Sequence, residues 1–150
     1  MILGCCIFWA FPIVLHGQVS VGCSNGQVSF RQYQPIMYPD LARRASAYGD
    51  YTDVFDLVIK PGGEFFYTMP NHPSDGKAQM FREPIVDALS GWRFVNSTDQ
   101  AINLKLNVLF EFSGTVSDLS DNKVQNLIIF GKNDITIKVT ASKIVLKIRS

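Results

Sequence analysis

The feature that most constrains the fold is a stretch of eleven residues, 102 to 112, in which apolar and polar side chains alternate. Its apolar residues occupy every second position: Ile102, Leu104, Leu106, Val108, Phe110 and Phe112. Most positions between them are polar: Asn103, Lys105, Asn107 and Glu111. A two-residue period is the pattern of a β-strand with one face buried and the other in water. The stretch therefore predicts a strand that is longer than the usual length of about five or six residues and that faces a core.

Residues 51 to 69 predict a β-hairpin. Large apolar side chains share one face from Tyr51 to Ile59, and the turn Pro61-Gly62-Gly63 follows. Glycine supplies the positive φ that tight turns require. Residues 64 to 69 would then form the returning strand.

Two short helices are expected. Pro39 suits the first position of a helix, where its missing N–H costs nothing, and apolar residues then recur at helical spacing up to Gly49. A second amphipathic pattern covers residues 78 to 92. Because Pro84 is incompatible with a regular helix interior, we expect this helix to begin close to Pro84 and to end at Gly91.

The tail after residue 113 is typical of a β-meander, with short strands at 124–130, 135–140 and 144–148. Lysines recur along this tail. Charged residues commonly protect exposed strands from aggregation, and we favour that explanation over a nucleic-acid groove. With a net charge of +1, the chain is too balanced for phosphate binding driven by counterion release, so no nucleic-acid partner is expected.

Residues 1 to 17 have the pattern of a secretory signal peptide. A nearly unbroken apolar run from Ile2 to Leu15 is followed by small and polar residues, with cleavage after Gly17 or Ser20, although no Lys or Arg precedes the run. The run is shorter than the roughly 20 residues that a membrane-spanning helix needs. We expect a periplasmic or secreted protein, and favour this over lipid attachment at Cys23. The alternative is a buried N-terminal strand or helix.

Residues 18 to 34 are polar and contain glycine, with little periodicity. They predict a linker, or a short leading strand around residues 28 to 30.

Neither the composition nor any motif points to catalysis. The three cysteines lie within the first 23 residues, so no disulfide or zinc site is expected in the body of the fold. That body holds one histidine, His72, and no Gly-x-Ser-x-Gly, His-Glu-x-x-His or phosphate-binding glycine loop. Asp53 and Asp56 are three residues apart on a strand and therefore point to opposite faces. We expect a protein that is not an enzyme, with no catalytic residues, no cofactor and no metal.

An ordered set of short motifs carries a family resemblance: Tyr38-Pro39, Ala42-Arg43, Gly49, Gly62-Gly63, Ala88, Trp92-Arg93-Phe94 and the aromatic residues Phe110 and Phe112. With the predicted elements, this set resembles the C-terminal domain of the TonB family over about residues 35 to 112. The resemblance implies an α+β fold with two helices on an antiparallel sheet, and a periplasmic location. It also implies a non-catalytic role in docking short segments of outer-membrane receptors by strand addition.

The chain departs from that family at several points. Asp53 stands where the family usually has an apolar residue, and Arg82 replaces the usual acidic cap before the second helix. The chain also shows neither a convincing membrane anchor nor a long proline-rich spacer, so force transmission from an inner-membrane motor is not expected.

These observations divide the chain into a signal peptide or short hydrophobic N-terminus (1–17), a linker (18–34), a TonB-like domain (35–113) and a β-strand extension (114–150). We expect an exported protein-interaction module of the cell envelope that receives a peptide by strand addition along residues 102 to 112. The expected partner contacts are Tyr38, Arg43, Arg93, Asn103, Lys105 and Asn107. For Tyr38 the alternative is core packing, and for Arg43 a solvated helix face.

A structural or homodimeric envelope protein remains the second interpretation. In it, the C-terminal strands pair with residues 102 to 112 and cover that edge.

Overall fold

The computed structural model describes residues 17–21, 25–45, 50–69, 75–117 and 124–144. The described strands are β1 (Gly17–Val21), β2 (Val28–Gln32), β3 (Tyr51–Ile59), β4 (Phe65–Thr68), β5 (Arg93–Asn96), β6 (Ile102–Ser117), β7 (Val124–Phe130) and β8 (Asp134–Ile144). The described helices are α1 (Asp40–Ala45) and α2 (Gly76–Gly91). Of the expected signal segment, residues 1 to 17, only Gly17 is described, and it begins β1.

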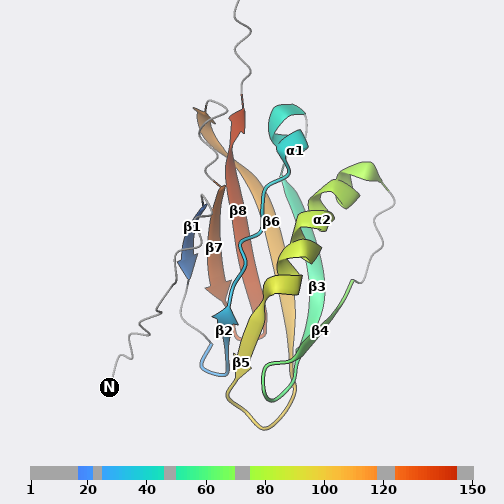
Figure 1. Ribbon diagram of the computed structural model, residues 1–150, viewed down its shortest axis with the longest axis vertical. Coiled ribbons are helices and arrows are strands. Elements are labelled where there is room, and N and C mark those ends of the chain that lie inside the picture. The colour runs from blue at the N-terminus through green and yellow to red at the C-terminus, as the bar shows by residue number, and fades with distance from the viewer. Residues whose placement is uncertain (1–16, 22–24, 46–49, 70–74, 118–123, 145–150) are drawn as a thin grey trace, which may run out of the picture.

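Six strands form one sheet in the order β1-β7-β8-β6-β3-β4, and β2 pairs with β5 in a separate two-stranded ribbon. Figure 1 shows the two helices and this ribbon in front of one face of the large sheet. The expected α+β class is confirmed. The opposite face, which we call the open face, carries no helix in the described part of the chain.

The expectation of an antiparallel sheet is wrong, because the sheet is mixed. β3 pairs antiparallel with β4 and β6, but β6 pairs parallel with β8, and β1 pairs parallel with β7. The cause is the antiparallel β7–β8 hairpin. Its second strand, rather than its first, lies beside β6, so β8 must run in the same direction as β6.

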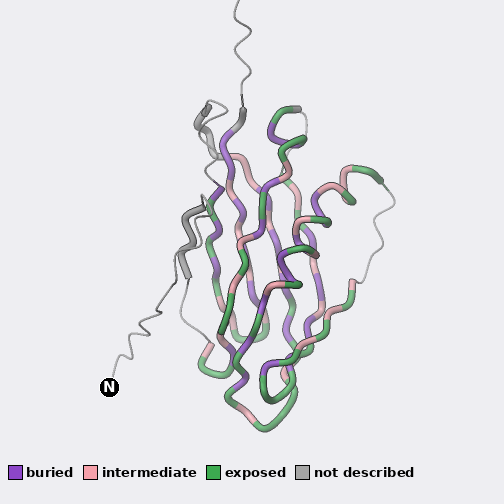
Figure 2. Tube along the Cα trace, viewed as in Figure 1, coloured by how far each residue is buried: buried purple, intermediate pink, exposed green. Residues whose placement is uncertain are grey.

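The alternation in β6 is confirmed by its burial. Leu104, Leu106, Val108 and Phe110 are buried, whereas Asn103 and Lys105 are exposed. Figure 2 shows the same alternation of buried and exposed residues along the strands of the sheet. Neighbouring strands contribute further buried residues to the core: Phe55, Leu57, Ile59, Ile128, Ile135, Ile137 and Val139.

Helix α2 begins eight residues earlier than the sequence predicts, at Gly76 rather than close to Pro84. Asp75 caps its first turn by accepting a hydrogen bond from the Ala78 N–H at 2.6 Å. Pro84 removes one hydrogen bond from the helix interior. Phe81 and Ile85, both fully buried, pack on either side of that position. Core packing therefore stabilises a helix that continues on both sides of Pro84, the residue that local propensity predicts as its start.

Most other predicted elements are confirmed with small differences in their ends. β3, β4 and β7 lie where they were expected, and β2 includes the leading strand expected at 28–30. The break expected after residue 140 is wrong, because β8 continues through Ile144 in parallel pairing with β6. Residues 46–49, with the expected helix stop, and the strand expected at 144–148 lie largely outside the described residues. Within the described ranges, no helix is long and apolar enough to span a membrane.

Candidate partner-binding site

The six residues expected to contact a partner are not brought together. Tyr38 belongs to the core: it is 2% exposed, and its ring lies within 5.8 Å of the rings of Phe81, Phe110 and Phe112. Burial, with a smaller effect of the nearby Asp50 carboxylate, raises the pKa of Tyr38 to about 12. The core-packing alternative therefore describes the position of this side chain.

Arg43 is also buried, with 1% of its surface exposed, so the alternative of a solvated helix face is wrong. Its Nε donates to the main-chain oxygen of Ser142 at 3.1 Å, and its Nη1 lies 3.8 Å from a carboxylate oxygen of Asp40. The guanidinium thus ties α1 to β8. A buried arginine that satisfies a main-chain oxygen stabilises the packing of the two elements.

Asn103, Lys105 and Asn107 lie along β6 toward the open face. The Lys105 ammonium lies 3.3 Å from Asp56 on β3, and the Asn107 amide donates to Asp134 on β8 at 3.4 Å. These contacts are cross-strand pairs of a hydrated sheet surface.

β6 is an interior strand rather than an edge. β3 pairs with it from Ile102 to Phe110, and β8 pairs with it from Lys105 to Ser117. The expected pairing of the tail strands with residues 102 to 112 is confirmed. A peptide adding along most of β6 would have to displace β8.

Asp53 and Arg82, the two departures from the family pattern, form one buried ion pair. Nε and Nη2 of Arg82 each donate to one carboxylate oxygen of Asp53 at 2.7 Å, and the side chains are only 9% and 7% exposed. The hydrogen bond to Asp53 raises the pKa of Arg82 above its ordinary value. Each buried charge is therefore compensated by the other.

β4 forms the edge of the large sheet. It pairs with β3 and with no other strand among the described elements. The main-chain N–H of Lys60 donates to the main-chain oxygen of Glu64, so residues 60 and 64 are a hydrogen-bonded pair. Antiparallel strands alternate between hydrogen-bonded and non-hydrogen-bonded pairs, so residues 65 and 67 of β4 are in non-hydrogen-bonded pairs. The main-chain groups of Phe65 and Tyr67 are therefore directed away from β3. We call this row of groups the β4 edge.

β4 is a short edge strand of four residues, and short length is one of the features that limit pairing at a sheet edge. Natural edge strands commonly carry lysine, proline or a bulge, whereas β4 reads Phe-Phe-Tyr-Thr. Phe66 is 49% exposed, and the Lys60 ammonium lies 4.4 Å from the centre of its ring. An uncharged aromatic edge has no side-chain charge to oppose pairing with a further strand.

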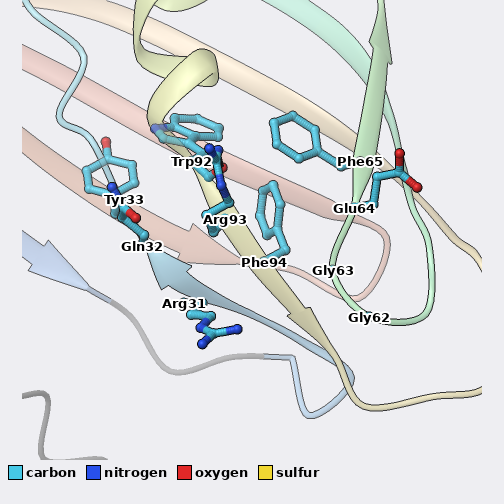
Figure 3. Close-up of a pocket in the computed structure, with 10 residues that line it drawn as sticks. All are labelled: Arg31, Gln32, Tyr33, Gly62, Gly63, Glu64, Phe65, Trp92, Arg93 and Phe94. Carbon is cyan, nitrogen blue, oxygen red and sulfur yellow. Dashed lines mark hydrogen bonds between the residues drawn. The ribbon is translucent and has the colours of Figure 1, made fainter.

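An open groove of about 1010 Å³ adjoins the start of β4, and we call it the arginine groove (Figure 3). Segments from β2, the β3–β4 turn and β5 form it. Its lining residues are Arg31, Gln32, Tyr33, Gly62, Gly63, Glu64, Phe65, Trp92, Arg93 and Phe94. Of the predicted contacts, Arg93 lies here. Phe65 belongs both to the lining of the groove and to the β4 edge.

The floor of the arginine groove is a rigid aromatic cluster. The ring centres of Phe65 and Phe94 are 5.0 Å apart, and those of Tyr33 and Trp92 are 5.4 Å apart. Trp92 Nε1 donates to the main-chain oxygen of Gln34 at 2.8 Å. Aromatic rings fixed by hydrogen bonds at their polar ends form a preorganised apolar surface.

Asn126 of β7 holds the segment that follows β2. Its side-chain oxygen accepts from the Tyr33 hydroxyl at 2.6 Å and from the Ile36 N–H at 2.9 Å, and its amide nitrogen donates to the Ile36 oxygen at 3.0 Å. Burial raises the pKa of Tyr33 well above its ordinary value. One buried amide thus fixes one wall of the arginine groove to the large sheet.

A β-bulge places Arg31 on the rim of the groove. Phe30 pairs with Phe94 and Gln32 pairs with Arg93, so Arg31 is the extra residue between them. Arg31 and Gln32 are consecutive and both exposed, which a regular strand would not allow on one face. The bulge also turns Tyr33 inward against Trp92.

A smaller, largely apolar hollow of about 220 Å³ lies beyond the other end of β4, between Met69 and α2. Val86, Glu83 and Asp87 line its helical side, together with Gln79 and the ion-paired Arg82. The β4 edge therefore runs from the arginine groove toward this second hollow.

Sequence reasoning missed the β4 edge and Arg31. The uncharged run Phe65 to Thr68 was a usable signal for the edge, but nothing local indicates that its strand lies outermost. No cluster of three or more His, Cys, Asp or Glu side chains that could hold a metal ion occurs in the described ranges.

Comparison with known proteins adds no relative. No family model matches the chain, and no match was found among curated proteins or solved structures. The resemblance to the TonB C-terminal domain thus rests on the sequence motifs alone.

Proposed function

We propose that the chain is a non-enzymatic protein-interaction module that binds an extended segment of a partner by strand addition to the β4 edge. The observation that carries this proposal is the uncharged edge strand β4 with Phe66 half exposed. The proposal moves the receiving strand from β6 to β4, because β6 is hydrogen-bonded on both sides.

Strand addition needs main-chain groups and a place for alternate side chains. The outward groups of Phe65 and Tyr67 supply the hydrogen bonds. Side chains of an added segment that point to the helical side would lie near the arginine groove at one end and the second hollow at the other. The site therefore combines main-chain affinity with two positions that select side chains.

The cellular setting belongs to the same proposal. The apolar N-terminal run and the resemblance to the TonB family support export to the periplasm, and a cell-envelope partner such as a segment of an outer-membrane receptor. A link to transport across the outer membrane follows from that resemblance.

A second candidate is a structural or self-associating envelope protein. The observation that favours it is the pairing of β8 with β6, by which the chain's own C-terminal strand covers the edge expected to receive a partner. In this case a second copy would pair with the β4 edge, and the protein would form a homodimer.

The test removes one outward main-chain donor. In Tyr67→Pro the N–H directed away from β3 is lost while the β3–β4 hydrogen bonds are kept. Tyr67→Val is the matched control, because it removes the same ring and keeps the N–H. Peptides are first selected from a displayed random library on the full chain, and synthetic copies are then titrated by fluorescence anisotropy.

We expect the selected peptides to bind the wild-type chain and Tyr67→Val but not Tyr67→Pro. Binding should also protect the amides of Phe65 and Tyr67 from hydrogen exchange. Absence of any selected peptide, or equal binding to the proline variant, contradicts the proposal. A dimer in sedimentation that dissociates in Tyr67→Pro favours the self-associating candidate instead.

A further inference from the structure

We propose that the segment received at the β4 edge is charge-polarised, with an acidic side chain on its C-terminal side held by Arg31 and Arg93. This inference rests on the proposed function and adds the chemistry of the partner. Three steps carry it: the charge of the arginine groove, the position of that charge relative to β4, and the opposite charge at the other end.

The arginine groove has an excess of positive charge. Arg31 and Arg93 are exposed, and neither forms an ion pair within the part of the chain that the structure describes. The one acidic residue in the lining, Glu64, lies 3.4 Å from the Lys60 ammonium outside it. Two arginines in a shared groove repel each other, and a bound carboxylate relieves that repulsion.

The position of Arg93 is fixed by the end of α2. Its Nη1 donates to the main-chain oxygens of Ser90 and Trp92, so the side chain is held against the end of α2. The β-bulge sets Arg31 beside the Gln32–Arg93 pair. Arg31 and Arg93 both line the groove beside aromatic side chains, and guanidinium groups next to an apolar surface match a carboxylate on a segment with apolar neighbours.

The position of the groove sets the direction of the segment. The groove contains Glu64 and Phe65, the residues at the N-terminal end of β4. An antiparallel added strand is the slightly more stable pairing, and its C-terminal end then lies over the groove. The acidic residue should therefore follow the residues that pair with β4.

The other end of β4 carries the opposite charge. Glu83 and Asp87 line the second hollow, and the only basic side chain in that lining, Arg82, is already paired with Asp53. A basic side chain near the N-terminal end of the segment complements this hollow. Residues 65 and 69 lie about 14 Å apart along a strand, so the two charges should be separated by about four residues.

The test uses the same random displayed library, selected on the full chain. Enriched peptides should carry Asp or Glu on the C-terminal side of an apolar, β-prone run and Lys or Arg before it. A synthetic selected peptide is then titrated against wild type, the double variant Arg31→Glu/Arg93→Glu, and Arg44→Glu. The last is the matched control, because Arg44 is an exposed arginine on α1 outside both hollows.

The double variant should weaken binding by about tenfold or more, whereas Arg44→Glu should leave it unchanged. Replacing the acidic residue of the peptide by lysine should restore binding to the double variant. Both arginines are exposed, so the variants should keep the wild-type far-UV circular dichroism and urea midpoint.

The two proposals fail differently. If selected peptides depend on the Tyr67 N–H but show no acidic enrichment, and the double variant binds them as tightly as wild type, strand addition stands and the charge inference is overturned. If no peptide is selected, or binding survives in Tyr67→Pro, the proposed function itself fails and the charge inference fails with it.

Discussion

Removing one partner of the buried pair Asp53–Arg82 should destabilise the fold far more than replacing both partners by apolar residues. Asp53→Leu leaves the guanidinium without its carboxylate, and Arg82→Met leaves the carboxylate without its donors. The double variant removes both charges and fills the space with apolar side chains. The two donor–acceptor distances of 2.7 Å and the exposures below 10% make this a desolvated, bidentate pair.

The expected magnitudes follow from that geometry. Removing one partner of a buried ion pair typically costs about 3–5 kcal/mol, because the remaining charge stays buried without compensation. Replacing both partners by apolar residues is often neutral or stabilising. A domain of this size is stable by about 5–15 kcal/mol, so each single variant should lose a large fraction of its free energy of unfolding.

The assay is urea unfolding of the four members of the cycle, followed by far-UV circular dichroism and intrinsic fluorescence. Asp56→Asn is the matched control, on the same strand but on the open face. It breaks the ion pair of Asp56 with Lys105, in which the Lys105 side chain is 66% exposed and the Asp56 side chain 48%. This loss should cost less than about 1 kcal/mol of the free energy of unfolding.

Additivity would refute the reasoning. If the double variant is destabilised by the sum of the two single changes, the residues do not act as a pair. The same holds if each single variant loses no more stability than Asp56→Asn, because the charges would then be hydrated rather than buried.

Three further predictions concern other parts of the fold. Gly63→Ala should destabilise the chain more than Gly62→Ala in urea unfolding: both have positive φ, but a Cβ at Gly63 would meet a main-chain oxygen of β5, whereas one at Gly62 meets nothing, and equal losses would contradict this. Asn126→Leu should cost about 2–4 kcal/mol and speed hydrogen exchange at the Ile36 amide, which unchanged exchange would contradict. Tyr38→Phe should reduce the loss of stability as pH rises from about 10 toward 12, because the folded-state pKa is raised and the unfolded chain therefore loses its proton first; identical alkaline transitions would refute this.

Part of the candidate site was accessible from sequence and part was not. The Pro61-Gly62-Gly63 turn and the strand after it were predictable, because turn chemistry and side-chain period are local properties. Arg93 was named as a partner contact, and it is exposed in the lining of the arginine groove. That the strand from Phe65 to Thr68 is outermost, with the rim of β2 nearby, depends on contacts between distant segments.

Helix α2 shows how packing overrides a local rule. Pro84 predicts a helix start, yet the helix runs from Gly76 because the Asp75 cap and the burial of Phe81 and Ile85 outweigh one lost hydrogen bond. Asp53 shows that local sequence also fails to predict how a buried charge is compensated. Its apolar surroundings look unfavourable until the fold supplies Arg82 from a helix 29 residues away in the chain.

The sequence by itself determined the strands that have a clear two-residue period, such as residues 102–112, and which of their faces is buried. It did not predict β1 or β5, whose strand structure depends on pairing with distant segments. Only the tertiary structure decided which strands are neighbours. Every strand offers the same main-chain donors and acceptors, so β6 could have paired with either strand of the β7–β8 hairpin. β8 took that place beside β6, opposite β3, so β6 is an interior strand. β4 is the edge because β3 is the only described strand that pairs with it.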